Sequence, residues 1–267
     1  MAKSLGLWLQ FKVKENVYAI DCAYVKYIGV VNRNELTQTT DDKEYISGFF
    51  NLNNEIITLI NLRKIFGFDD LDKEITEFVD MLELRKQEHE EWARTLKNCI
   101  ETRKEFTLST DPHRWNFGMW YDNYKSDHSF VNFQLQKIDD PHQEFHALAK
   151  NVNALIHSDD PKAKDELNNI LKALEEEYVP TIIGLLEDTE AVFRTSLREM
   201  FVSINEKTVS MAISMDEVLG IEKLDVVVDG KGAEAQHLPD YIEGVARDKD
   251  GKLIMIVDVP KVLSMTE

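Results

Sequence analysis

Histidines are the residues in this sequence with the clearest capacity for chemistry. Six of the seven lie in the middle of the chain, and His142 and His146 are four residues apart. A helix would place both of these imidazoles on one face, within reach of the same ion. His89 lies in a different amphipathic segment. Three imidazoles on the inward faces of two helices are typical of a metal site, although a single buried histidine is more often a core residue. The spacing therefore leaves a metal site and a metal-free polar cluster as alternatives.

The segment that must position these histidines is predicted to be helical. Nine of the eleven glycines lie outside residues 70–199, and apolar side chains recur there every three or four positions. One apolar stripe covers residues 78–99, and a second long pattern covers residues 130–156. A third helix has Pro161 in its first turn, after residues that can cap it, and Pro180 should kink or break this same helix before the next helical run.

The segments on either side are predicted to form β strands. Residues 5–68 begin with alternating apolar and polar positions and a turn at residues 14–16, and residues 200–267 show the same pattern with turns at residues 205–207 and 249–251. Neither segment, at about 65 residues, makes a comfortable core alone. We therefore predict an α+β protein in which one β framework carries a helical insertion, with boundaries at residues 1–69, 70–198 and 199–267.

The composition limits the classes of partner. With 31 basic and 49 acidic residues the net charge is -18, which argues against binding to nucleic acid or to anionic lipid. No run approaches the length of a membrane-spanning helix, and the N-terminal segment lacks a small-residue cleavage site, so we expect a cytoplasmic protein without direct membrane insertion. Cys22 and Cys99 are far apart and form no CxxC motif, which argues against a disulfide framework and a cysteine-rich metal site.

Three stretches of the β segments resemble the CheW family of chemotaxis coupling proteins. They are "YISGFFNLNNEIITLINLRKIFG", "KTVSMAISMDEVLGIEKLD" and "YIEGVARDKDGKLIMIVDVPKVLS". The resemblance implies a CheW-like pair of small five-stranded β-barrels without catalytic residues. It also implies two partners, the cytoplasmic tips of chemoreceptors and the histidine kinase CheA.

The same resemblance points to two partner-binding positions. Arg63 of "INLR" is kept, whereas Asn53 stands where the family carries arginine. Because asparagine has neither the charge nor the planar fork of arginine, the usual coupling contact is expected to be weaker at position 53. The alternative is that position 53 is a turn position that is free to vary.

The helical insert resembles the CZB (chemoreceptor zinc-binding) domain, a four-helix bundle that holds zinc between helices. The shared motifs are "HEEW", which begins at His89, then "DPHRWNFGMWYDNY" and "PHQEFH". The resemblance assigns zinc ligation to His89, His142 and His146. Trp115 stands where the family has its cysteine ligand, and an indole offers only an N–H donor. A direct thiol-based oxidant switch is therefore not expected at this position.

Three explanations are open for the missing fourth ligand. His113, two residues from Trp115, is the candidate from the protein itself, although it also suits a cap or surface contact of the short helix there. Cys99 is excluded because it lies ten residues beyond His89, about 15 Å along the same helix. Water is the second explanation. In the third, the indole of Trp115 fills the space of the metal and leaves a metal-free cluster.

These patterns lead to one main hypothesis and two alternatives. The main hypothesis is a non-enzymatic chemotaxis adaptor whose inserted antiparallel four-helix bundle binds zinc and acts as a regulatory or sensory module. The first alternative is a metal-free interaction protein in which Trp115 fills the zinc site. A zinc-dependent hydrolase is remote, because the sequence shows no convincing general base beside the histidines. Homodimerisation through the bundle is left open.

Overall fold

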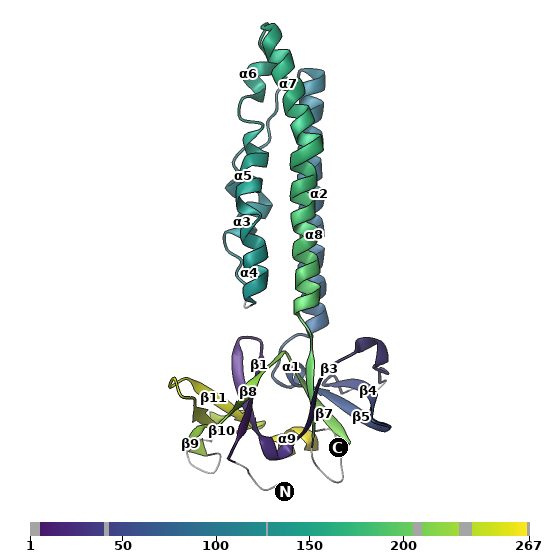
Figure 1. Cartoon of the computed structure of the whole chain (residues 1–267), viewed down its shortest axis with the longest axis vertical. Coiled ribbons are helices and arrows are strands. Elements are labelled where there is room, and N and C mark those ends of the chain that lie inside the picture. The colour runs from purple at the N-terminus through teal and green to yellow at the C-terminus, as the bar shows by residue number, and fades with distance from the viewer. Residues whose placement is uncertain (1–5, 40–42, 127, 205–209, 230–236, 266–267) are drawn as a thin grey trace. The chain divides into compact units, whose positions relative to one another are not determined.

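A computed structural model describes the chain except for residues 1–5, 40–42, 127, 205–209, 230–236 and 266–267. It contains two compact units (Figure 1). The framework unit comprises Met1–Lys73 together with Leu197–Glu267, and the helical unit comprises Glu74–Ser196. Among the described residues, no helix is both long enough and apolar enough to cross a membrane.

Two sheets form the framework unit, and each contains strands from both ends of the chain. The first has the order β8-β1-β2-β11-β10-β9 and the second has the order β3-β6-β7-β5-β4. Parallel pairs β2–β11 and β5–β7 join strands that precede the helical insertion to strands that follow it. The strands of the first sheet are β1 (Trp8–Val13), β2 (Asn16–Asp21), β8 (Glu217–Glu222), β9 (Asp225–Asp229), β10 (Ile242–Arg247) and β11 (Leu253–Val257). Those of the second are β3 (Val25–Val30), β4 (Ile46–Leu52), β5 (Glu55–Asn61), β6 (Met200–Ile204) and β7 (Met211–Met215).

The predicted α+β framework with two β-sheets is confirmed, whereas closure of the sheets into a pair of five-stranded barrels is not found among the described residues. The structure has one six-stranded and one five-stranded sheet, and across the described ranges neither sheet has a pairing that joins its end strands. The extra strand is β9, which pairs antiparallel with β10 and extends the first sheet by one edge. The short "DVVVD" run of β9 does not alternate between apolar and polar residues. The sequence pattern therefore cannot distinguish an edge strand from a connecting loop there.

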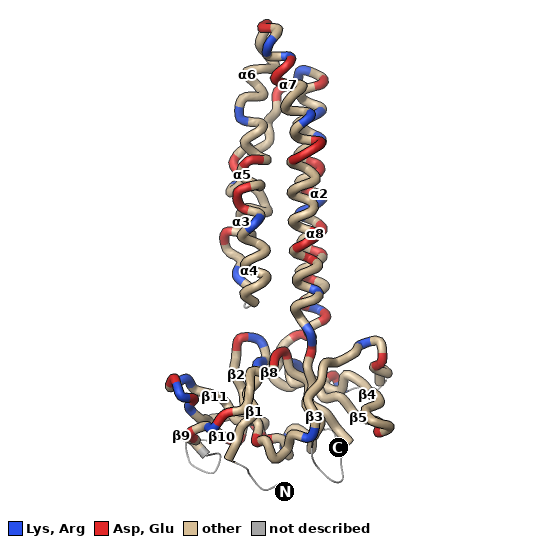
Figure 2. Tube along the Cα trace, viewed as in Figure 1, with Lys and Arg blue, Asp and Glu red and all other residues tan. Residues whose placement is uncertain are grey.

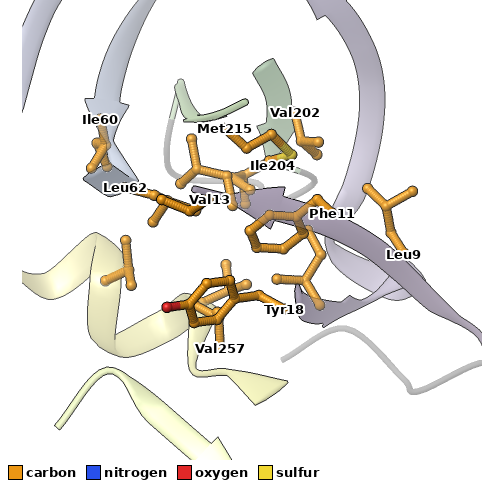
Figure 3. Packing of buried hydrophobic residues seen from close by; sticks show 14 of the residues in the cluster. Leu9, Phe11, Val13, Tyr18, Ile60, Leu62, Val202, Ile204, Met215 and Val257 are labelled. Carbon is orange, nitrogen blue, oxygen red and sulfur yellow. The ribbon is translucent and has the colours of Figure 1, made fainter. Parts of the chain in front are cut away.

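One apolar core lies between the sheets, and Figure 3 shows its packing. Phe11 and Tyr18 stack with ring centroids 5.9 Å apart, and Val202 and Met215 from the far end of the chain are buried in the same cluster. The short helices α1 (Leu62–Ile65) and α9 (Val259–Ser264) also bury side chains there. The two β segments thus share a core that neither could form alone.

The turns of the framework follow the sequence signals where the structure describes them. The β1–β2 hairpin turns at residues 14–15, with Lys14 at a φ of 55°, and the β10–β11 hairpin contains Gly251 at a φ of 79°. Asp248 closes the latter turn by accepting hydrogen bonds from the backbone N–H groups of Asp250 and Lys252. The predicted turn at residues 205–207 lies outside the described residues.

Two long helical stretches run through the helical unit. Helix α2 (Leu71–Thr102) buries the predicted stripe, including Phe78, Leu82 and Leu96. The other stretch consists of α7 (Pro161–Ala173), capped by Asp160, then a π-helical turn (Leu174–Tyr178) and α8 (Val179–Ser196). Figure 2 shows acidic positions distributed along α2 and α8, as expected for solvated outer faces.

Pro180 does not break its helix, contrary to the expectation of a kink or break from the sequence. The π-helical turn directly before it widens the backbone, and the Val179 N–H bonds to the Leu174 carbonyl five residues back. Proline lacks the N–H that would continue the ladder, and a π turn absorbs this interruption without ending the helix.

The second predicted long pattern is divided into short helices. They are α4 (Ser129–Gln136), α5 (Asp139–Ala147) and α6 (Val152–Ile156), preceded by α3 (Asn116–Tyr121). Phe130 and Phe133, taken from sequence as part of an apolar stripe, are 54% and 62% exposed. The structure therefore confirms that the insert is helical, whereas the regular four-helix arrangement stays a prediction. Because the chain is interrupted between α4, α5 and α6, one continuous helical periodicity does not describe it.

Candidate metal centre

The three predicted zinc ligands come together inside the helical unit. Helix α2 supplies His89 and helix α5 supplies His142 and His146, which lie one turn apart as their spacing predicted. All three side chains are buried, with exposures of 1%, 4% and 0%. Their candidate ligand nitrogens lie within 4.8 Å of one another. This is the geometry of a cluster that can close on one ion.

The hydrogen bonds of the cluster leave ring nitrogens free to bind. His89 Nδ1 lies 2.7 Å from the carbonyl oxygen of Arg85, which can only accept, so Nδ1 carries the proton and Nε2 carries the lone pair. His89 Nε2, His142 Nε2 and both ring nitrogens of His146 are buried without a hydrogen-bond partner among the described residues. A buried polar atom without a hydrogen bond costs free energy. Unpaired nitrogens on three converging histidines therefore point to a missing ligand.

Aromatic side chains surround the histidines. Phe117 lies 4.8 Å from the His142 ring and Trp92 lies 4.7 Å from the His146 ring, centroid to centroid. The ring centroid of Phe145 lies 4.7 Å from that of Trp92 and 5.3 Å from that of His146. The Trp92 indole N–H donates to the Ser109 carbonyl and not to a histidine. The surroundings are therefore apolar on most sides and strengthen any electrostatic interaction inside them.

Burial keeps the three imidazoles neutral. It is the main cause that lowers the pKa of His142 to about 2 and that of His146 to about 3, and nearby histidines push in the same direction. Burial also lowers the pKa of His89, against an opposing effect of the Arg85 carbonyl. The backbone of Ser109 approaches the His146 ring without forming a well-aligned hydrogen bond, and it opposes the downward shift of the His146 pKa, as does the charge of Asp111. Neutral imidazole is the form that ligates metals, so at neutral pH no proton has to leave.

None of the candidate residues Trp115, His113 and Cys99 supplies a fourth ligand to the three histidines. Trp115 is half-buried, and its ring centroid lies 6.2 Å from that of His89 and 5.8 Å from that of His146. The His113 side chain is 52% exposed and pairs with Asp122 at 3.0 Å. Cys99 is buried, but its thiol donates to the Glu105 carbonyl.

The residues present fit zinc with three ligands. Tetrahedral zinc with Zn–N bonds of about 2.0–2.1 Å needs ligand nitrogens that are closer to one another than the 4.8 Å limit seen here. Small rotations of the histidine side chains can close this difference. The donor set is all imidazole, which suits zinc and other borderline divalent metals.

The comparison with protein families decides the nature of the framework. The model of the CheW-like domain matches residues 7–90 and 184–267, more than half of the chain. The chain belongs to the CheW-like domain family. A second model, the chemoreceptor zinc-binding domain, matches residues 89–153, a range that begins at His89 and contains the other two histidines. No curated protein matches the chain.

Among solved structures, the CheW-like chain matches the crystal structure of the scaffolding protein TtCheW from Thermoanaerobacter tengcongensis. The match has 13% sequence identity and a TM-score of 0.39, and it covers 97% of this chain and 90% of the other.

The two predicted partner-binding residues of the CheW-like framework lie in different environments. Asn53 is exposed at the β4–β5 turn, where Asn53 and Asn54 have φ angles of 54° and 68°. Two left-handed residues in a two-residue hairpin loop form the type I′ geometry that asparagine tolerates. The side chain of Arg63 is only 5% exposed, and its Nε and Nη2 donate to the Asp216 carboxylate at 2.5 and 2.7 Å. Partner contact at either residue stays a prediction.

A groove on the five-stranded sheet was not anticipated from the sequence. It is lined by residues of β3 and β4 and by Phe201 of β6, and Tyr27, Phe50 and Leu52 supply apolar walls. Its lining reaches Leu52, next to the exposed Asn53. Alternation in β3 and β4 signals a strand face, but these are the two edge strands of the sheet. Only contacts across the curled sheet bring their residues together, such as the Phe50 and Phe201 rings with centroids 4.9 Å apart and the bridge between Thr37 and Phe49.

A charged cluster at the ends of the insertion was also missed. Arg33 Nη2 lies 2.5 Å from the Glu199 carboxylate and Nη1 lies 2.9 Å from that of Asp72. Burial raises the pKa of Glu199, and Arg33 opposes that shift. Arg33 therefore holds together the segment where α2 begins and the segment where β6 begins. No periodicity marks such a contact, because its members are far apart in sequence.

Proposed function

We propose that the chain is a non-enzymatic chemotaxis adaptor that links chemoreceptor cytoplasmic tips to the histidine kinase CheA. We propose further that its helical insert is a zinc-responsive regulatory module. One observation supports the proposal most strongly: an all-buried cluster of three histidines with unpaired nitrogens, inside a CZB-matched insert of a CheW-like framework. The domain boundaries at residues 69 and 198 and the cytoplasmic location stay predictions.

His89, His142 and His146 would hold the zinc, and the chemistry that zinc supplies there is a cross-link between α2 and α5. The neutral imidazoles present their lone pairs without prior loss of a proton, and the Arg85 carbonyl orients His89 through Nδ1. Helix α2 carries His89 and runs unbroken from Leu71, within the framework unit, to Thr102. Ordering of α2 is therefore the physical link that we propose between the metal site and the framework.

The proposed partner contacts lie on the CheW-like framework. Asn53 offers an exposed hairpin tip, and the groove lined by Tyr27, Phe50 and Leu52 lies beside that hairpin in the same sheet. Arg63 would act indirectly, because its guanidinium is held by Asp216 and by the Asp69 carbonyl. Phe50→Ser should weaken binding to receptor and kinase. Ile56→Ser, which replaces an exposed apolar residue on the next strand, serves as the control and should weaken binding less.

Reconstituted receptor–kinase complexes test the regulatory role. Kinase activity is measured with wild-type adaptor, with His142→Ala, and with His113→Ala as the matched control for loss of an exposed histidine, each with added zinc and with a chelator. We expect a zinc-dependent change with the wild type and with His113→Ala that disappears with His142→Ala. Equal activity under all conditions would remove the regulatory role, and no stimulation of coupling by any variant would remove the adaptor role.

A metal-free interaction protein is the second candidate, and the position of Trp115 favours it. The indole lies beside two of the three histidines, where it can serve as packing for a polar cluster. Metal analysis of protein purified without a histidine tag separates the two candidates, since absence of zinc supports the packing role. Homodimerisation through the helical unit stays a prediction, which analytical ultracentrifugation tests.

A further inference from the structure

We propose that the three-histidine site, once loaded with metal, keeps its fourth coordination position open to a small anion from solution. The inference rests on the proposed metal binding and concerns what completes the site. The ligand class is a small monovalent anion, such as hydroxide, a halide or azide. The anion would replace a bound water without any covalent step.

The count of donors is the first step. Zinc in proteins takes four ligands, and the cluster formed by the described residues offers three, all of them imidazoles. His113 is half-exposed and paired with Asp122, and the Cys99 thiol donates to the Glu105 carbonyl. Trp115 lies nearby but has no lone pair to give. The fourth ligand must therefore come from outside the cluster.

The balance of charge is the second step. Three neutral imidazoles leave the full charge of a divalent ion uncompensated, in surroundings that are largely aromatic. Glu88, which precedes His89, is engaged by Arg85 at 2.6 Å and by Asn116 at 2.7 Å. Asp111, whose charge acts on His146, is paired with Arg114 at 3.2 Å. An uncompensated charge in a low-dielectric interior is costly. A negatively charged fourth ligand is therefore favoured over neutral water.

Access to the open position is the third step. Trp92, Phe117 and Phe145, which pack around the histidines, are buried, whereas Trp115 is half-buried. Trp115 therefore marks the side of the cluster that approaches solvent. Its indole N–H can donate a hydrogen bond to an anion, although it cannot ligate the metal. The bulk of the ring beside two histidines restricts the position to small ligands.

Cobalt(II) is the probe, because its visible spectrum reports the coordination sphere directly. The full-length protein is loaded with Co²⁺ and titrated with sodium azide, with sodium perchlorate as the ionic-strength control. We expect a saturable shift of the cobalt absorption bands with azide and none with perchlorate. Trp115→Cys should show a new thiolate-to-cobalt charge-transfer band and lose the azide shift, because the thiolate supplies both the ligand and the charge.

Two further variants keep the test decisive if Trp115→Cys does not fold. His113→Ala should retain the wild-type cobalt spectrum and the azide shift, and Trp115→Ala should retain the shift. Cobalt binding without any azide shift would overturn the open position while leaving the proposed metal binding intact. A changed spectrum in His113→Ala would identify His113 as the fourth ligand and also overturn it. Failure to bind cobalt or zinc at all would overturn both proposals together.

Discussion

Acid should destabilise the metal-free helical unit because its three histidines are buried in the neutral form. Burial depresses the folded-state pKa of His142 to about 2 and of His146 to about 3, and it also lowers that of His89. In the unfolded chain each imidazole titrates near pH 6.5. The unfolded state therefore binds more protons at every pH between the two values, so stability is complete above the unfolded pKa and is lost as the pH falls below it.

The magnitude follows from proton linkage. Between pH 7 and pH 5.5, protonation of one imidazole in the unfolded state alone lowers the free energy of unfolding by about 1.3 kcal/mol. His142 and His146 together contribute about 2.5 kcal/mol, and His89 adds to the loss in the same direction. This is a large part of the stability of an ordinary domain.

Urea unfolding followed by far-UV circular dichroism, in the presence of a chelator, measures the effect at both pH values. His142→Phe fills the site with an apolar ring and should reduce the loss by about 1.3 kcal/mol, because one titrating group is removed. His113→Gln provides the matched control for replacement of an exposed imidazole. If wild type and His142→Phe lost the same stability on acidification, the histidines would not be buried and neutral as described.

The remaining predictions concern the metal and the framework. Wild-type protein should carry about one zinc per chain by elemental analysis, and His142→Ala should lose it because two imidazoles cannot hold the ion; retention by the variant would contradict the assignment. Arg63→Met should lower the free energy of unfolding by about 3–5 kcal/mol in urea, since it leaves the Asp216 carboxylate, 9% exposed, without its cationic partner and with the Lys14 backbone N–H as its remaining donor; a loss below about 1 kcal/mol would mean that the pair is solvated. Asn54 has a φ of 68°, which glycine adopts more readily than asparagine, so Asn54→Gly should stabilise the β4–β5 turn by up to about 1 kcal/mol. Destabilisation in thermal unfolding would argue against a type I′ turn.

Local pattern was most informative where side chains repeat. The helical stripe of α2, the hairpins at residues 14–15 and 249–251, and the cap and first turn at Asp160–Pro161 all follow from periodicity or turn chemistry. The spacing of His142 and His146 likewise depends only on the helical repeat. Such features involve neighbours in sequence, so the sequence expresses them directly.

Long-range features escaped prediction for a common reason. The addition of β9 to the first sheet, the continuation of the helix past Pro180 and the exposure of Phe130 and Phe133 depend on which elements pack together. The cluster of Arg33 with Asp72 and Glu199 joins three distant segments. No local rule assigns a partner to an isolated charge.

Membership of the CheW-like family, the helical insertion and the identity of the three histidines follow from residue types and their spacing. The packing of the helices and sheets was needed to show that the histidine nitrogens converge in a buried site, that Arg63 pairs with Asp216, and that Trp115 lies beside two histidines. Residue types and spacing are properties of the chain, whereas convergence, burial and dielectric environment arise only when separate helices pack against one another.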